Sequence, residues 1–131
     1  MALWDPPAEI GILLYPDVAW GTVHGLTDLF NVATTLAREH CGPSAPILRV
    51  THWRVESEKR SVDCVFDTHP HLPHGPAAVI VPGSWRGQPA ADVRSRLIDW
   101  LGERHAAAQR SARSAAALSF SPRPDCWRAA P

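Results

Sequence analysis

No segment of this chain is apolar over the roughly 18 consecutive residues that a membrane-spanning helix needs. An excess of charge of one sign is also missing, because 13 lysine and arginine residues balance 13 aspartate and glutamate residues. A nucleic-acid-binding protein usually carries a basic patch that attracts the phosphate backbone. The balanced charge argues against direct binding of DNA or RNA by this chain, and no contact with a membrane is expected.

Cysteine is scarce, and its number is odd. Cys41, Cys64 and Cys126 leave one thiol over in any disulfide pairing, and no two of them have Cys-x-x-Cys spacing. The first residues, Met1 to Pro7, lack the basic and apolar regions of a signal peptide. We therefore expect a reduced protein of the cytoplasm.

Proline is abundant, with 13 residues that divide the chain into short segments. Two continuous apolar runs, 9–15 and 77–82, stop at proline or glycine and are typical of strands covered on both faces, as in a parallel sheet. Residues 47–55 also favour a strand, which their polar residues place near a sheet edge, and 62–66 favour a short, weak one.

Two segments repeat their apolar residues at helical spacing. The first spans 19–40, and its stripe consists of Val23, Leu26, Phe30, Ala33 and Ala37, widened by Leu29 and Leu36. The second runs from Pro89 to about Ala107, and its stripe consists of Val93, Leu97, Ile98 and Leu101. The alternation of strands and helices predicts an α/β fold with a mainly parallel sheet and helices on both faces.

Beyond Ala107 the apolar pattern stops, and the chain continues mainly as Ala, Ser, Arg and Pro with no regular spacing of apolar residues. An α/β fold would need a further strand after its last helix, so the fold is expected to be incomplete at its C-terminal end. We therefore divide the chain into an α/β domain over 1–107 and an unstructured tail over 108–131.

Four pieces of 1–107 follow one another in the order of a known family. They are I-G-I-L-L-Y-P-D from Ile10, G-L-T-D-L-F-N-V-A from Gly25, A-A-V-I-V-P-G-S from Ala77 and R-L-I-D-W-L from Arg96. Their order resembles the class I glutamine amidotransferase-like domain of the PfpI superfamily, in the version fused to AraC-type transcriptional regulators. The resemblance implies a flavodoxin-like fold, an unidentified small-molecule effector and no cofactor.

The resemblance fails where that family carries a cysteine turn of the form V-C-x-G-A and a helix F-L-L-A-x-x-G-L-L. Another reading frame permits this segment, because the codons of Asp125, Cys126 and Trp127 read from each third base always give Leu-Leu. The codons of Arg113 to Ala129 permit V-C-G-G-A-F-L-L-A-E-T-G-L-L-A-G in the same frame. We interpret the residues from about 108 onward as a frameshifted end, and a natural disordered tail is the alternative.

The resemblance also points to ligand-binding residues. In the related hydrolases, backbone amides of the glycine loop stabilise an oxyanion beside the cysteine, and here Gly83 and Ser84 occupy that loop. A simple turn after a buried strand is the alternative for Gly83. Trp20 and Trp85 follow predicted strands, and so should lie at the carboxyl edge where α/β sheets bind ligands. Asp17 lies near the place of the acid that hydrolytic members carry.

Three histidines, His69, His71 and His74, lie close together in T-H-P-H-L-P-H-G. Three imidazoles can bind zinc, but the prolines prevent them from sharing a helix face, and no cysteine or acid lies at finger spacing. A solvated proline-rich loop is preferred, and no metal ligand is assigned. Cys41 and Cys64 are expected to be inert packing residues.

Hydrolytic relatives carry an acid where this chain has Gly21, and no catalytic residue is assigned. The sequence therefore predicts the ligand-sensing N-terminal part of an AraC-family regulator, without the DNA-binding half that full-length relatives use. A truncated PfpI-like cysteine hydrolase or hydratase is one alternative, and a small non-catalytic interaction protein is another. Whether the chain forms a homodimer stays open.

Overall fold

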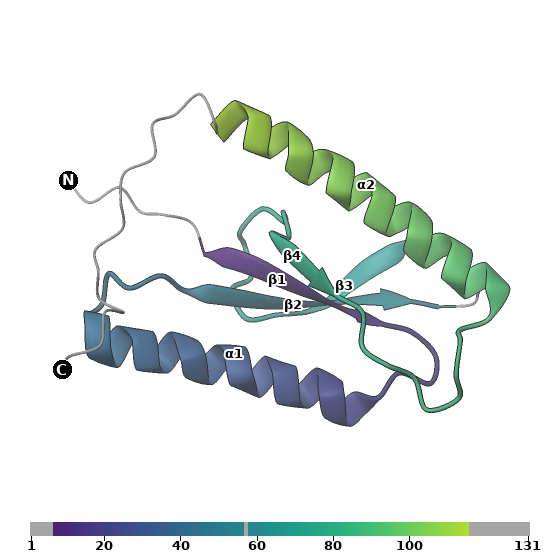
Figure 1. The fold of residues 1–131 in the computed structure, drawn as a ribbon, viewed down its shortest axis with the longest axis horizontal. Helices are drawn as coiled ribbons and strands as arrows, with labels where there is room; N and C mark the ends of the chain where they lie inside the picture. The colour runs from purple at the N-terminus through teal and green to yellow at the C-terminus, as the bar shows by residue number, and fades with distance from the viewer. Residues whose placement is uncertain (1–6, 57, 116–131) are drawn as a thin grey trace.

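A computed structural model describes residues 7–56 and 58–115 of the chain. These residues form the elements β1 (Ala8–Leu14), α1 (Trp20–Cys41), β2 (Leu48–Val55), β3 (Val62–Asp67), β4 (Ala78–Ile80) and α2 (Ala91–Ala115). The strands form one sheet in the order β3-β2-β1-β4, in which β1 is parallel to β2 and β4. β3 runs antiparallel to β2. The two helices lie on opposite faces of the sheet (Figure 1), so the predicted α/β fold with a mainly parallel sheet is confirmed.

β1 lies in the interior of this sheet, as its apolar sequence predicts. Ile12 and Leu13 are adjacent and therefore point to opposite faces, yet both are 0% exposed. A strand that is covered on both faces needs apolar residues at every position, and this is why the run does not alternate.

Two predictions about strand position are wrong. β2, expected near an edge, is an inner strand between β1 and β3. Its polar residues Thr51 and His52 are buried because each has a partner: Thr51 donates to Glu9 Oε1 at 2.8 Å, and His52 Nε2 lies 2.9 Å from Thr27 Oγ1. Burial lowers the pKa of His52.

β4, expected to be a buried strand over 77–82, has only three residues and lies at the edge of the described sheet. Val81, just beyond it, is 48% exposed. The apolar run predicts a strand correctly, but apolarity alone does not show whether a neighbouring strand covers it.

The helices match their predicted stripes at the centre and differ at the margins. Val23 on α1 and Val93 and Leu97 on α2 are buried. Leu29 and Leu36, which widen the first stripe, are exposed, and so is Ile98, which was wrongly expected within the second. A helix on a single sheet buries only one stripe of its surface, and these marginal positions lie beyond it. The stripe of α2 also includes Trp100, whose ring centroid lies 5.2 Å from that of Trp53.

α2 continues to Ala115, so the boundary predicted at residue 107 falls inside the helix. The alanine-rich sequence that follows Ala107 lacks an apolar stripe, but alanine has the highest helix propensity of all residues. The absence of regularly spaced apolar residues therefore does not exclude a helix. The rest of the proposed frameshifted tail, 116–131, lies outside the described residues.

Candidate functional site

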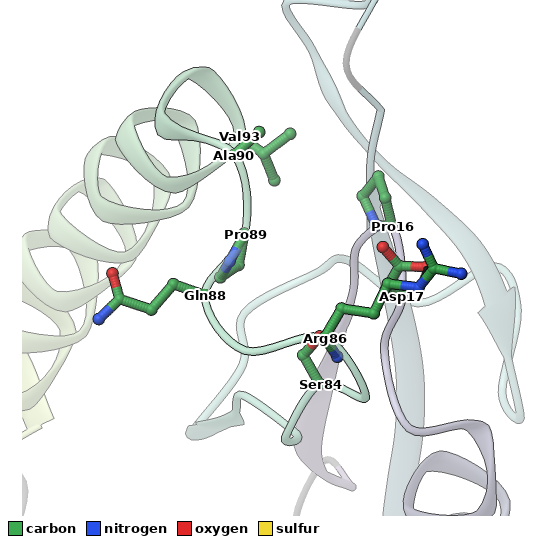
Figure 2. A pocket seen from close by; sticks show the side chains of 8 residues that line it. All are labelled: Pro16, Asp17, Ser84, Arg86, Gln88, Pro89, Ala90 and Val93. Carbon is green, nitrogen blue, oxygen red and sulfur yellow. Dashed lines mark hydrogen bonds and ion pairs between the residues drawn. The ribbon is translucent and has the colours of Figure 1, made fainter.

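The order of the strands reverses between β1 and β4. From β1 the chain crosses through α1 to β2 on one side, and later it returns to β4 on the other side of β1. Open α/β sheets bind ligands at such a point, outside the carboxyl ends of the strands. A cleft of about 100 Å³ lies there (Figure 2), lined by Pro16, Asp17, Ser84, Arg86, Gln88, Pro89, Ala90 and Val93.

Backbone hydrogen bonds fix the two segments that form this cleft. The Ala19 N–H donates to the Gly83 carbonyl at 2.8 Å, and the Trp85 N–H donates to the Asp17 carbonyl at 3.1 Å. The segment after β1 is thereby joined to the segment after β4. The shape of the cleft is therefore set by the main chain.

Asp17 occupies a tight turn directly after β1. The Val18 N–H donates to the Tyr15 carbonyl at 3.1 Å, and Asp17 has a φ of 67° in the left-handed region. Aspartate adopts that region more readily than most residues, and the preceding Pro16 has the fixed φ that such a turn requires. The Tyr15 hydroxyl donates to the Pro82 carbonyl, and burial raises the pKa of Tyr15. This turn holds the Asp17 side chain at the cleft.

Asp17 and Arg86 carry the charge of the cleft. Arg86 Nε lies 3.9 Å from Asp17 Oδ1, and the two side chains are 82% and 55% exposed. Figure 2 shows the Arg86 side chain reaching toward Asp17. An ion pair that is this exposed to solvent contributes little to the stability of the fold. It can therefore separate to admit a ligand. Ser84 adds a hydroxyl, which accepts a hydrogen bond from the Arg86 N–H at 3.2 Å.

The predicted ligand-binding residues divide into two groups. Asp17 and Ser84 line the cleft, whereas Gly83, Trp20 and Trp85 are not among its lining residues. The Gly83 carbonyl accepts the hydrogen bond from the Ala19 N–H that joins the two segments of the cleft. Trp85 is 80% exposed to solvent, whereas Trp20 is 46% exposed and its ring stacks on that of His24.

Arg86 and Gln88 line the cleft but were not expected there from the sequence. Both follow the glycine loop after a predicted strand, and this position in the sequence could have predicted that they lie at the cleft. Gln88 accepts a hydrogen bond from Arg94 at 2.6 Å. Figure 2 shows its side chain pointing away from Asp17, so Arg86 is the residue that faces Asp17 across the cleft.

A second group of functional side chains, the buried charged cluster, consists of the buried Glu9 and Arg49 together with the half-buried Asp67 and the exposed His74. Arg49 is 2% exposed, and it donates from Nε to Asp67 Oδ1 at 2.9 Å and from Nη2 to Oδ2 at 2.6 Å. This bidentate hydrogen bonding holds the pKa of Asp67 below its usual range. Glu9, which faces Arg49 across the strand pair, is 3% exposed and lies 3.5 Å from its guanidinium.

The buried charged cluster also fixes the proline-rich loop that precedes β4. Arg49 donates to the carbonyls of Leu72 and Pro73 at 3.0 and 2.9 Å, and the Gly75 N–H donates to Glu9 Oε2 at 2.7 Å. The backbone of this part of the loop is thus anchored, while Pro73, His74 and Gly75 are exposed, as expected of a solvated loop. Charged side chains inside apolar strands are the sequence signal for such a cluster, since they are rarely buried without partners.

His74 is the histidine of the loop whose side chain joins this cluster, whereas His69 donates to Asp67 Oδ1 only from its backbone N–H. His74 Nδ1 lies 3.4 Å from Glu9 Oε1, and its Nε2 lies 4.0 Å from Asp67 Oδ2. Ligand atoms of Cys64, Asp67 and His74 all lie within 4.8 Å of one another, so these residues could hold a metal ion. His69 instead contacts the Thr68 hydroxyl, and His71 is exposed with a φ of 77°.

No family model, curated protein or solved structure matches this chain. The likeness to the PfpI superfamily therefore stays a prediction from the sequence pieces. In the described part of the chain, neither helix combines the length and apolarity that crossing a membrane requires.

Proposed function

We propose that this chain is a ligand-sensing module that binds a small effector in the cleft at the ends of β1 and β4. The observation that carries the proposal is the position of Asp17, Ser84 and Arg86, which converge where the strand order reverses. Binding sites of α/β sheets occur at that position for a topological reason that does not depend on the family. The resemblance to the domain fused to AraC-type regulators supports a sensing role.

The size and charge of the cleft restrict the effector. A volume of about 100 Å³ admits a molecule of only a few non-hydrogen atoms. Arg86 donates hydrogen bonds and Asp17 accepts them, so a ligand with both an acceptor and a donor fits better than a simple anion. Small amino acids and short carboxamides belong to this class.

The cleft supports binding better than covalent catalysis. Its lining residues include neither a cysteine nor a histidine. Cys41 ends α1, and Cys64 lies on β3, where burial raises the pKa of its thiol. Hydrolysis by the mechanism of the PfpI superfamily needs a thiolate of low pKa, and so we favour a sensor over a truncated hydrolase.

Calorimetric titration of the full chain with small amino acids and short carboxamides tests the cleft. We expect Arg86→Ala to weaken binding roughly tenfold or more, because a hydrogen bond to a charged group contributes about 1.5–3 kcal/mol. Asp17→Asn, which keeps a residue suited to the left-handed turn, should also weaken it. Arg54→Ala is the matched control, since Arg54 forms a similarly exposed ion pair with Glu56. Equal effects of Arg54→Ala and Arg86→Ala would exclude the cleft as the site.

The genomic DNA through and beyond codon 131 tests the regulator part of the proposal. We expect a one-base correction near codon 107 to restore the V-C-G-G-A segment and to open a frame into a basic helix-turn-helix region. A stop codon soon after the segment would favour the stand-alone enzyme instead. A corrected frame without the segment would refute the frameshift.

A further inference from the structure

β3 contains a bulge that brings two of its residues to the same face of the sheet. Thr51 pairs with Asp67, but Trp53 pairs with Cys64, because the register shifts between His52 and Trp53. Residues opposite each other share a face, so Cys64 and Asp67 both lie on the face of Trp53. In a regular strand, residues three apart point to opposite faces. Bulges re-aim side chains in this way and are frequent beside functional sites.

His74 approaches this pair from the loop before β4. The loop is fixed by Arg49 and Glu9, and the closest ligand atoms of Cys64, Asp67 and His74 lie within 4.8 Å of one another. A thiolate, an imidazole and a carboxylate together are a typical ligand set for Zn²⁺. β3 and the loop that follows it thus bring one such ligand set together.

The charged groups around these ligands act on a cation in both directions, because Arg49 contacts Asp67 and His74. Glu9 and Asp67 are two carboxylates, and Arg49 is the guanidinium that contacts both. The guanidinium compensates one carboxylate and leaves one negative charge in surroundings where Glu9 and Arg49 are only 3% exposed. A divalent cation bound through a Cys64 thiolate would neutralise the group, although the nearby Arg49 lowers its affinity.

We propose that Cys64, Asp67 and His74 form a Zn²⁺ site, separate from the cleft, with water as the fourth ligand. His74 Nδ1 lies 3.2 Å from Arg49 Nη2 and 3.4 Å from Glu9 Oε1, so these two buried side chains hold the imidazole beside Cys64 and Asp67. Ligand atoms around tetrahedral zinc are roughly 3.3–3.7 Å apart, given its bond lengths. His74, whose side chain is 34% exposed, is the ligand that moves inward on binding.

Titration of the reduced full chain with Co²⁺ tests the site, because a cobalt–thiolate bond absorbs in the near ultraviolet. We use a Cys41→Ser, Cys126→Ser background, in which Cys64 is the only thiol. One equivalent of Co²⁺ should give the thiolate band, and Zn²⁺ should abolish it. His74→Gln should weaken binding at least tenfold, whereas His71→Gln, an exposed histidine of the same loop, should leave it unchanged.

Three results would overturn the proposal: no thiolate band, a band that survives Cys64→Ser, or equal losses in His71→Gln and His74→Gln. If a ligand variant fails to fold, the site can still be tested on the natural chain. Zn²⁺ should protect Cys64 of the natural chain from alkylation, and a chelator should reverse the protection. Alkylation of Cys64 at the same rate with and without Zn²⁺ would also refute the site.

Discussion

Replacing Arg49 by methionine should destabilise the protein by about 3–5 kcal/mol, the usual effect of removing one partner from a buried ion pair. Arg49 binds both oxygens of Asp67 and lies 3.5 Å from Glu9. Methionine fills a similar volume but leaves these carboxylates without their cation. Urea unfolding of the variant and of the natural chain measures the difference.

Two variants distinguish a buried charge from a simple loss of packing. Arg54→Met removes an exposed arginine, whose ion pair with Glu56 spans 3.8 Å, and should cost less than about 1 kcal/mol. Adding Glu9→Gln to Arg49→Met should recover part of the loss, because a neutral amide needs no cation. A loss below about 1 kcal/mol for Arg49→Met would show that the cluster is hydrated rather than buried.

Trp53→Ala should cost about 3–5 kcal/mol of unfolding free energy, since it removes a large buried ring and leaves a cavity. Trp53 is 5% exposed, lies 5.2 Å from the ring of Trp100 and has the Arg104 guanidinium 5.0 Å from its centroid. Its Nε1–H donates to Thr51 Oγ1 at 2.9 Å. These contacts join β2 to α2, and so their loss should loosen the helix from the sheet.

A graded series keeps this prediction measurable even if Trp53→Ala does not fold. Trp53→Phe keeps an aromatic ring but loses the hydrogen bond, and should cost clearly less than the alanine variant. Trp85, 80% exposed, is the matched control, and Trp85→Ala should change stability by less than about 0.5 kcal/mol. Urea unfolding in which Trp85→Ala costs as much as Trp53→Ala would contradict the assignment of Trp53 to the core.

Local patterns predict the elements well, because local chemistry determines them. The helix expected over 19–40 is observed at Trp20–Cys41, and Gly42 ends it with a φ of 86°. The order of the strands depends instead on pairing between distant segments, and this is why β2, expected near an edge, is found between β1 and β3.

The cleft was partly predictable, whereas the pairing of partners within the buried charged cluster was not. Asp17 and Ser84 both follow strands, and the carboxyl ends of parallel strands meet at one edge. Glu9 and Arg49 become neighbours only through the register of β1 and β2. Likewise, a bulge in β3 places Cys64 beside Asp67, and no local pattern marks that bulge.

The most direct test of the sensing role is a map of backbone amide shifts by nuclear magnetic resonance, while small amino acids or short carboxamides are titrated into the full chain. Binding in the cleft predicts saturable shifts concentrated in 16–18 and 84–93, the segments that surround it in Figure 2. Arg86→Ala should abolish these shifts at the same ligand concentration. Saturable shifts along the exposed residues Leu29, Val32 and Leu36 of α1, with none at the cleft, would contradict the proposed site.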